Sequence, residues 1–192
     1  MHTVRHGSGK RLLVSIGDDI TAPEEFTVYA VTDIDWNRYL SPWPCEKVFA
    51  KGEPFAGEAD AFLEELLPKL NELIAEGWQD ATIIGYSLAG LFALYACTKT
   101  EIFDACASVS GSLWYPGFLE YLQEHKVQCT KVILSLGDKE AQTKNPLMRT
   151  VAERTEAVRT LLAGYTDVQF HWNPGNHFNE VEKRIDRAIH CL

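Results

Sequence analysis

Ser87 lies where an apolar, strand-like run meets an apolar, helical run, and a serine at such a corner can act as a nucleophile. The run at residues 81–86 leads into Ser87, and the helical pattern begins at Leu88. Gly85 and Ala89 on either side are small, which a tight strand-to-helix turn requires if the hydroxyl is to point clear of the sheet. The usual spelling is G-x-S-x-G, so Ala89 is a mild departure from it. Because a serine here can equally be a helix N-cap, the motif needs support from elsewhere in the chain.

His177 is the histidine best placed to serve Ser87 as a base. The base must take the serine proton during attack and return it to the leaving group. His177 stands in the loop at residues 173–178, directly after a predicted strand, whereas the other five histidines lie near the chain ends, near helix ends or within a strand. Loops at the carboxyl ends of parallel strands hold the working residues of α/β proteins. We therefore predict that His177 is the general base.

The acid that orients His177 is either Glu140 or Asp138, which lie in one loop after a strand predicted at residues 131–136. Either carboxylate could accept the second imidazole N–H. The chain order is then serine, acid, histidine, which is the order of α/β-hydrolases. In many of these the acid stands three residues after the glycine that ends this strand, which favours Glu140, and an aspartate directly after a glycine is a common turn former. Asp138 stays the alternative acid.

An oxyanion formed at Ser87 would need two backbone N–H donors. The first is expected from Leu88, because one donor normally comes from the residue after the nucleophile. The second normally comes from a loop after an earlier strand, and the sequence offers residues 17–18 or residues 33–35. We favour Gly17 and Asp18.

Strand-like and helix-like runs alternate along most of the chain. Several strand cores are apolar without two-fold alternation, which is typical of parallel strands covered on both faces. A three-layer α/β fold follows, with a mostly parallel sheet of about six or more strands, helices on both faces and no large lid. A proline in the longest helix, Pro68, is expected to kink it. The predicted strands cover residues 11–16, 26–31, 81–86, 105–110, 131–136 and 168–172, and the predicted helices cover residues 57–76, 88–99, 115–124, 146–163 and 179–189.

Length and composition restrict the class of protein. The 192 residues fit a single domain, residues 1–192, and the net charge of -9 argues against nucleic acid as a partner. No apolar stretch approaches the length of a membrane span and the amino terminus lacks a signal-peptide pattern, so we expect a cytoplasmic protein without a membrane partner. Five scattered cysteines without a CxxC motif predict reduced thiols and neither a zinc site nor disulfides.

The sequence resembles the esterase D-like branch of the α/β-hydrolases, which includes S-formylglutathione hydrolases and feruloyl, acetyl and siderophore esterases. The resemblance covers roughly three quarters of the chain. It departs from the family pattern at Ala89, at Gly111 where the family usually has proline, and in a short amino-terminal region. It is carried by NRYLSP (37–42), the helix with Pro68, GYSLAGLFALYA (85–96), FDA (103–105), SGSLWY (110–115) and the short Gly-x-His loop (175–177).

This resemblance implies the three-layer α/β-hydrolase fold and a serine hydrolase that cleaves small-molecule carboxylic esters through an acyl-enzyme, without cofactor or metal. Ser87 would attack, His177 would carry the proton and Glu140 would orient the imidazole. Aromatic residues in or beside the loops around the site are candidates for substrate binding. They are Trp36, Trp43, Tyr86, Trp114, Tyr115 and Phe178.

Two alternative functions stay open. The same three residues support a thioesterase or an acyltransferase, because an acyl-enzyme can pass its acyl group to water, a thiol or another alcohol. A relative could also keep the fold as a non-catalytic binding scaffold, since fold does not fix function. The sequence does not indicate an oligomeric state.

Overall fold

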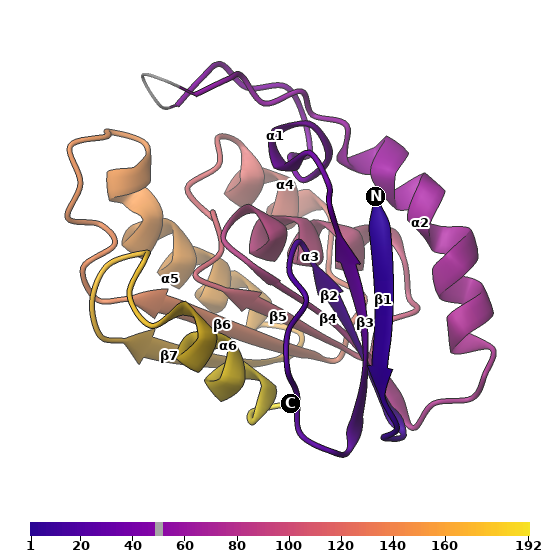
Figure 1. The fold of residues 1–192 in the computed structure, drawn as a ribbon. Coiled ribbons are helices and arrows are strands. Elements are labelled where there is room, and N and C mark those ends of the chain that lie inside the picture. The colour runs from indigo at the N-terminus through magenta and orange to yellow at the C-terminus, as the bar shows by residue number, and fades with distance from the viewer. Residues whose placement is uncertain (49–51) are drawn as a thin grey trace.

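A seven-stranded sheet forms the centre of the computed structural model, which describes residues 1–48 and 52–192 (Figure 1). The strand order is β1-β3-β2-β4-β5-β6-β7, with β1 antiparallel to β3 and every other pair parallel. The predicted α/β class with a mostly parallel sheet is confirmed. The strands are β1 (His2–Gly7), β2 (Arg11–Ile16), β3 (Phe26–Thr32), β4 (Asp80–Tyr86), β5 (Ala105–Val109), β6 (Lys131–Gly137) and β7 (Asp167–Asn173).

The edge strand β1 is the strand that the sequence analysis missed. None of its residues is buried, and it pairs with β3 alone. An edge strand has one unpaired side and can carry charged side chains, which blunt the edge against pairing with other chains. Arg5, for example, donates to Glu76 at 2.9 and 2.8 Å instead of packing in the core. Its composition therefore lacks the apolar run by which the inner strands were recognised.

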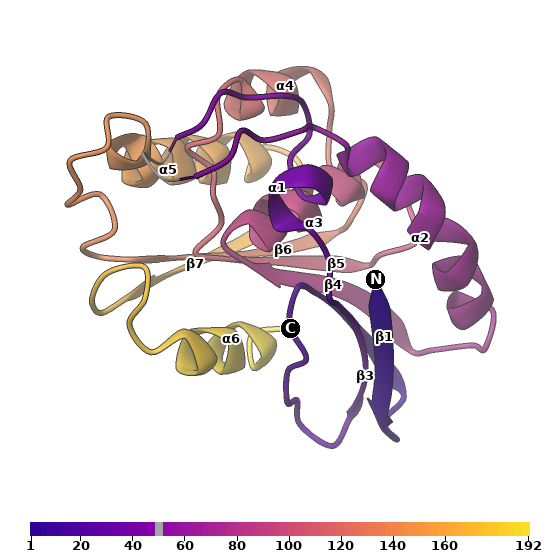
Figure 2. The same ribbon diagram turned by 45° about the horizontal axis from the view of Figure 1, so that its top comes forward.

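Helices cover the two faces of the sheet unevenly (Figure 2). The larger apolar core joins one face of the sheet to α2, α3, α4 and α5, while the smaller core joins the other face to α6 and the loop between β2 and β3. Both faces are covered, as the sequence predicted. The helices are α1 (Trp36–Tyr39), α2 (Ala59–Ile74), α3 (Leu88–Lys99), α4 (Phe118–Glu124), the 3-10 turn η1 (Met148–Thr150), α5 (Val151–Leu162) and α6 (Val181–Ile189).

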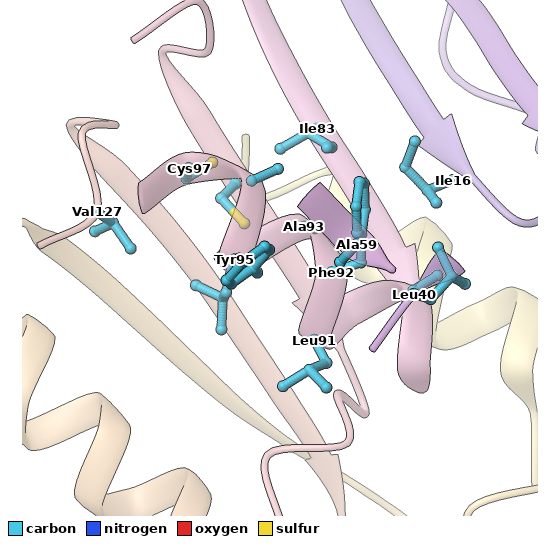
Figure 3. Close-up of a cluster of buried hydrophobic side chains, with 14 of the residues drawn as sticks. Ile16, Leu40, Ala59, Ile83, Leu91, Phe92, Ala93, Tyr95, Cys97 and Val127 are labelled. Atoms are coloured by element: carbon cyan, nitrogen blue, oxygen red, sulfur yellow. The ribbon is translucent and has the colours of Figure 1, made fainter. Parts of the chain in front are cut away.

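The helix that follows Ser87 lies in the middle of the larger core. Ten of the 12 residues of α3 are buried, so the helix is apolar almost all round. Figure 3 shows Leu91, Phe92 and Tyr95 of α3 in one cluster with Ile83 of β4 and Ile16 of β2. Since interiors are close-packed, this burial fixes the start of α3, and with it Ser87, relative to the sheet.

The long helix predicted at residues 57–76 is present as α2. Pro68 lies inside it, and the helix continues on both sides of the proline. Gly77 follows the helix in a left-handed conformation with a φ of 85°, as a glycine helix terminator does. The helices predicted at residues 115–124 and 179–189 begin a few residues later than expected, as α4 and α6. Among the helices in residues 1–48 and 52–192, none is long and apolar enough to cross a membrane.

Candidate active site

The corner that carries Ser87 is strained in the way a nucleophile elbow is. β4 ends at Tyr86 and α3 begins at Leu88, and Ser87 between them has a φ of 58° and a ψ of -121°. Such a conformation is rare for a residue other than glycine, and it persists only where the surroundings enforce it. The carbonyl of Ser87 accepts from the N–H groups of Gly90 at 3.1 Å and Ser112 at 2.9 Å. The backbone thus fixes the serine from both sides.

Small residues around this corner are required by backbone contacts. A Cβ on Gly85 would overlap the carbonyl of Ala89, and a Cβ on Gly111 would overlap the hydroxyl of Ser108. Gly111 stands where the resembled family usually has proline, and the buried Ser108 beneath it leaves no room for one. Ala89, the mild departure from the usual motif, is fully buried, so the core accommodates its methyl group.

His177 lies between Ser87 and Glu140 and contacts both. Its Nε2 is 2.9 Å from the Oγ of Ser87, and its Nδ1 is 2.7 Å from Oε2 of Glu140. The histidine comes from the loop between β7 and α6, and the glutamate comes from the loop after β6. Ser87 and Glu140, which are 90 and 37 positions away from His177 in the sequence, therefore meet it at the carboxyl end of the sheet.

Glu140, and not Asp138, is the carboxylate that the structure places beside His177. Glu140 is 8% exposed, and its Oε1 accepts from the N–H of Gly137 at 2.7 Å. Burial pushes the pKa of this carboxyl upward, but the hydrogen bond and charge of His177 and the N–H of Gly137 outweigh burial, so the pKa lies below its usual value. Asp138 instead accepts from the N–H of Gly175 at 2.8 Å, which ties the two loops together.

Two aromatic residues predicted to bind substrate, Tyr86 and Tyr115, have hydrogen-bond partners within the protein. The hydroxyl of Tyr86 donates to the backbone carbonyl of His177, and its ring packs on the imidazole with centroids 5.2 Å apart. Tyr115 is only 2% exposed and donates to the carbonyl of Trp43 at 2.6 Å. Burial raises the pKa of Tyr86, so its hydroxyl stays a donor near neutral pH. Trp43, in turn, donates to the carbonyl of Pro116 at 2.9 Å.

A pocket of about 230 Å³ opens beside Ser87. Its walls are mostly aromatic and apolar, and among the described residues it has no acidic or permanently charged side chain in its lining. Three of the predicted substrate-binding residues, Trp36, Trp114 and Phe178, do line it. The remaining lining residues are Asn37, Phe55, Ser87, Leu88, Ser112, Met148 and His177.

Four of these lining residues, Asn37, Phe55, Ser112 and Met148, were not predicted. Phe55 and Met148 reach the pocket from segments whose sequences carry no chemical motif. Asn37 and Ser112 do have a signal, because they lie within the blocks that carry the family resemblance. The Oγ of Ser112 lies 3.5 Å from the Oγ of Ser87, which puts a second hydroxyl next to the candidate nucleophile.

Of the three residues predicted to form the oxyanion hole, only Leu88 lines the pocket at Ser87. Leu88 lies in the pocket, directly after Ser87. The N–H of Gly17 donates to the carbonyl of Val31 at 2.8 Å, so it is engaged in the sheet and not free for an oxyanion, and the prediction for Gly17 is wrong. Asp18 lines a separate hollow of about 470 Å³ next to α6 and not the pocket at Ser87. Gly17 instead leaves room for the indole of Trp36, which a Cβ would overlap.

Within residues 1–48 and 52–192, no group of three or more histidine, cysteine or acidic side chains is arranged to hold a metal ion. All five cysteines are free thiols, and three of them, Cys97, Cys106 and Cys129, are buried. Burial keeps the pKa of the thiol of Cys106 above its usual value, although its contact with Cys97 acts in the opposite direction, so this group is an unreactive part of the core.

Comparisons with known proteins identify similar folds. No protein-family model matches the sequence, and no curated protein sequence matches it. The siderophore hydrolase EstA from Aspergillus nidulans is 17% identical with a TM-score of 0.66, over 97% of this chain and 82% of EstA. EstB from the same organism is 17% identical with a TM-score of 0.67, over 93% of this chain and 80% of EstB. The Pf2001 esterase of Pyrococcus furiosus is 13% identical with a TM-score of 0.59, over 96% of this chain and 81% of that esterase. Likeness at this level of identity is a likeness of fold.

Proposed function

We propose that this chain, which has the α/β-hydrolase fold, is a serine hydrolase that cleaves carboxylic esters through an acyl-enzyme. One observation carries the proposal: Ser87, His177 and Glu140 form a continuous line of hydrogen bonds that ends at an apolar pocket. A serine bonded to an imidazole whose other nitrogen is held by a carboxylate is the arrangement that nucleophilic acyl transfer needs.

In the first half of the reaction, the Oγ of Ser87 attacks the ester carbonyl carbon while its proton passes to Nε2 of His177. The 2.9 Å separation of these atoms allows direct transfer. Glu140 accepts the Nδ1–H of the imidazole and stabilises the imidazolium that forms. When the tetrahedral intermediate collapses, Nε2 returns the proton to the alcohol that leaves, and the acyl group stays on Ser87.

In the second half, water replaces the alcohol. His177 takes a proton from the water as it attacks the acyl carbon, and returns that proton to Ser87 when the carboxylic acid is released. The negative charge on the carbonyl oxygen needs donors at both stages. We assign one to the N–H of Leu88, and we propose the side-chain amide of Asn37, which lines the same pocket, as the second.

The pocket supports a small, uncharged acyl group as the substrate part bound next to Ser87. Its volume of about 230 Å³ is below the range of roughly 300–1,000 Å³ for sites that bind drug-sized ligands. Its aromatic walls offer no charged partner for an acyl group that carries a carboxylate or an amine. We also propose a cytoplasmic location, which the five free thiols support, and a small-molecule ester as the partner.

Hydrolysis of p-nitrophenyl esters tests the proposal. The wild type should hydrolyse acetyl and butyryl esters, and Ser87→Ala should lower the turnover by roughly 10⁴-fold or more. Ser112→Ala is the matched control, because it removes a hydroxyl 3.5 Å away in the same pocket, and we expect a loss of less than about tenfold. Equal turnover in wild type and a folded Ser87→Ala variant would contradict the proposal.

A further inference from the structure

Arg184 is a buried cation that touches most of the groups around His177. It lies on α6, is 2% exposed and is the largest of the fully buried side chains. Its Nη1 donates to Oε1 of Glu140 at 2.8 Å and to the hydroxyl of Ser110 at 3.0 Å. Its Nη2 donates to the carbonyl of Pro174 at 3.0 Å and to the carbonyl of Asn176 at 2.7 Å.

The guanidinium therefore connects three separate parts of the site. Glu140 belongs to the loop after β6, Ser110 follows β5, and Pro174 and Asn176 flank the start of the loop that carries His177. A guanidinium is planar, so its two terminal nitrogens, Nη1 and Nη2, present their donors in a fixed geometry. A buried charge is tolerated only when it is paired and hydrogen-bonded, and here these partners engage Nη1 and Nη2, while Nε has no hydrogen-bond partner among the described residues. The position of Glu140 and that of the histidine loop are thereby set by one rigid group.

The two oxygens of Glu140 are divided between Arg184 and His177. Oε1 accepts from Nη1 of Arg184 and from the N–H of Gly137. Oε2 is therefore available to accept the hydrogen bond from Nδ1 of His177. Without the guanidinium the carboxylate could rotate or accept other donors. The positive charge of Arg184 also weakens the attraction between the Glu140 carboxylate and a protonated His177, because both cations interact with the same negative charge.

We infer that Arg184 is a positioning residue of this site, which holds Glu140 and residues 174–176 so that His177 presents Nε2 to Ser87. The inference rests on the proposed function for its effect on turnover, but its geometric part can be measured without turnover. Arg184 is not one of the described residues that line the pocket beside Ser87, so its effect should appear in kcat and not in KM.

The test compares three variants. Arg184→Lys keeps a positive charge but loses the planar fork, and Arg184→Ala removes the whole group. Arg187→Gln is the control on the same helix, because Arg187 donates to Asn173 at 2.8 Å and does not contact Glu140. Circular dichroism and thermal melts establish which variants fold. For folded Arg184 variants we expect kcat to fall about 100-fold with KM within about threefold, and Arg187→Gln to stay within about twofold of the wild type.

Two readouts separate positioning from a structural role. The acidic limb of the kcat/KM profile should move to higher pH in Arg184→Ala. Glu140, which faces His177, Ser110 and the phenol of Tyr86, then loses the fixed positive charge of Arg184. Added guanidinium ion should restore part of kcat in Arg184→Ala, and ammonium ion at equal ionic strength should not. A kcat for folded Arg184→Lys and Arg184→Ala within about twofold of the wild type would overturn the inference.

Proton NMR makes the test independent of ester hydrolysis. The Nδ1 proton of His177 that Glu140 accepts should give a low-field resonance in the wild type and in Arg187→Gln, and this resonance should shift or broaden in Arg184→Lys. An unchanged resonance in folded Arg184→Lys contradicts the positioning role even if the wild type hydrolyses no ester. Conversely, a shifted resonance together with an inactive wild type would contradict only the proposed function.

Discussion

Ser87 and His177 line the same pocket, and they are held there by different means. Ser87 is fixed by its own backbone, in a strained corner whose neighbours must be small. His177 is fixed by side chains, since Arg184, Tyr86 and Glu140 bind its loop, its carbonyl and its ring. The nucleophile side is thus held mainly by backbone contacts, which include the N–H of Ser112, 25 positions away, and the histidine side is held by side-chain contacts.

The difference predicts how each side responds to substitution. On the histidine side, one polar group can be replaced while the fold stays intact, so turnover should suffer more than stability. On the nucleophile side, the contacts are between backbone atoms in a close-packed core, so a single added methyl group should affect stability and turnover together.

Among substitutions of the residues that surround Ser87 and His177, Glu140→Gln should show the largest loss of turnover. Glutamine keeps an acceptor oxygen for Gly137 and Arg184, but its amide cannot replace the carboxylate charge that stabilises the imidazolium and selects its tautomer. We expect a fall in kcat of roughly 10³- to 10⁴-fold, measured with p-nitrophenyl butyrate. Asp138→Asn is the matched control in the same loop, with a loss of about threefold or less, and a larger loss in Asp138→Asn than in Glu140→Gln would reverse the assignment of the acid.

Comparison of the wild type with Glu140→Gln also tests how the stability of the protein depends on pH. The pKa of Glu140 is lowered in the folded state, so the unfolded state takes up the proton first as the pH falls. This carboxylate therefore contributes stability above the usual glutamate pKa, and the contribution is lost as the pH falls through the lower, folded value. Urea unfolding of wild type and Glu140→Gln between about pH 7 and pH 3.5 should show a steeper loss in the wild type. Parallel curves would mean that Glu140 adds no such dependence.

Gly85→Ala should have the next largest effect, on the nucleophile side. The new methyl group would overlap the carbonyl of Ala89, which cannot move without shifting the start of α3 and Ser87. We expect a loss of about 3 kcal/mol in unfolding free energy and a fall in kcat of roughly 100-fold. Gly77→Ala, at a glycine with open space around it, should cost about 1 kcal/mol and leave kcat unchanged. A stable and fully active Gly85→Ala would show that the corner tolerates movement.

Phe178→Ala should have the smallest effect, because Phe178 is 85% exposed, lines the pocket wall and meets the His177 ring edge-on, with centroids 5.3 Å apart, without a hydrogen bond to it. We expect KM to rise about threefold for an apolar acyl ester, with a change in unfolding free energy within about 0.5 kcal/mol. Trp172→Ala is the control, since Trp172 is exposed on β7 and does not line the pocket. Similar KM changes in both variants would mean that Phe178 does not contact the substrate.

The same contrast explains what could be predicted from the sequence. The strand at residues 81–86, the helix from Leu88 and the strained serine between them follow from local apolar patterning and small neighbours, and these are the elements found. The loops with Glu140 and His177 were located because parallel strands bring their carboxyl ends together.

Other features depend on tertiary contacts that no local pattern encodes. Arg184 looks like an ordinary charged residue of an amphipathic helix, yet its partners include Glu140 and Ser110, which lie 44 and 74 positions away in the sequence. Tyr115 was expected in the pocket because it lies beside Trp114, but its hydroxyl points to the carbonyl of Trp43 in the core. The N–H of Gly17 is engaged by β3, a pairing that the sequence alone does not specify.

The most direct test of the account is to locate a fluorophosphonate adduct by mass spectrometry and to measure its rate of formation. We predict a single adduct on Ser87 in the wild type, formed roughly 10³-fold or more slowly in His177→Ala and absent in Ser87→Ala. The Ser112→Ala variant should still be labelled on Ser87. A folded wild type that forms no adduct on Ser87, or forms it on Ser112 instead, would contradict the assignment of Ser87 as a nucleophile activated by His177.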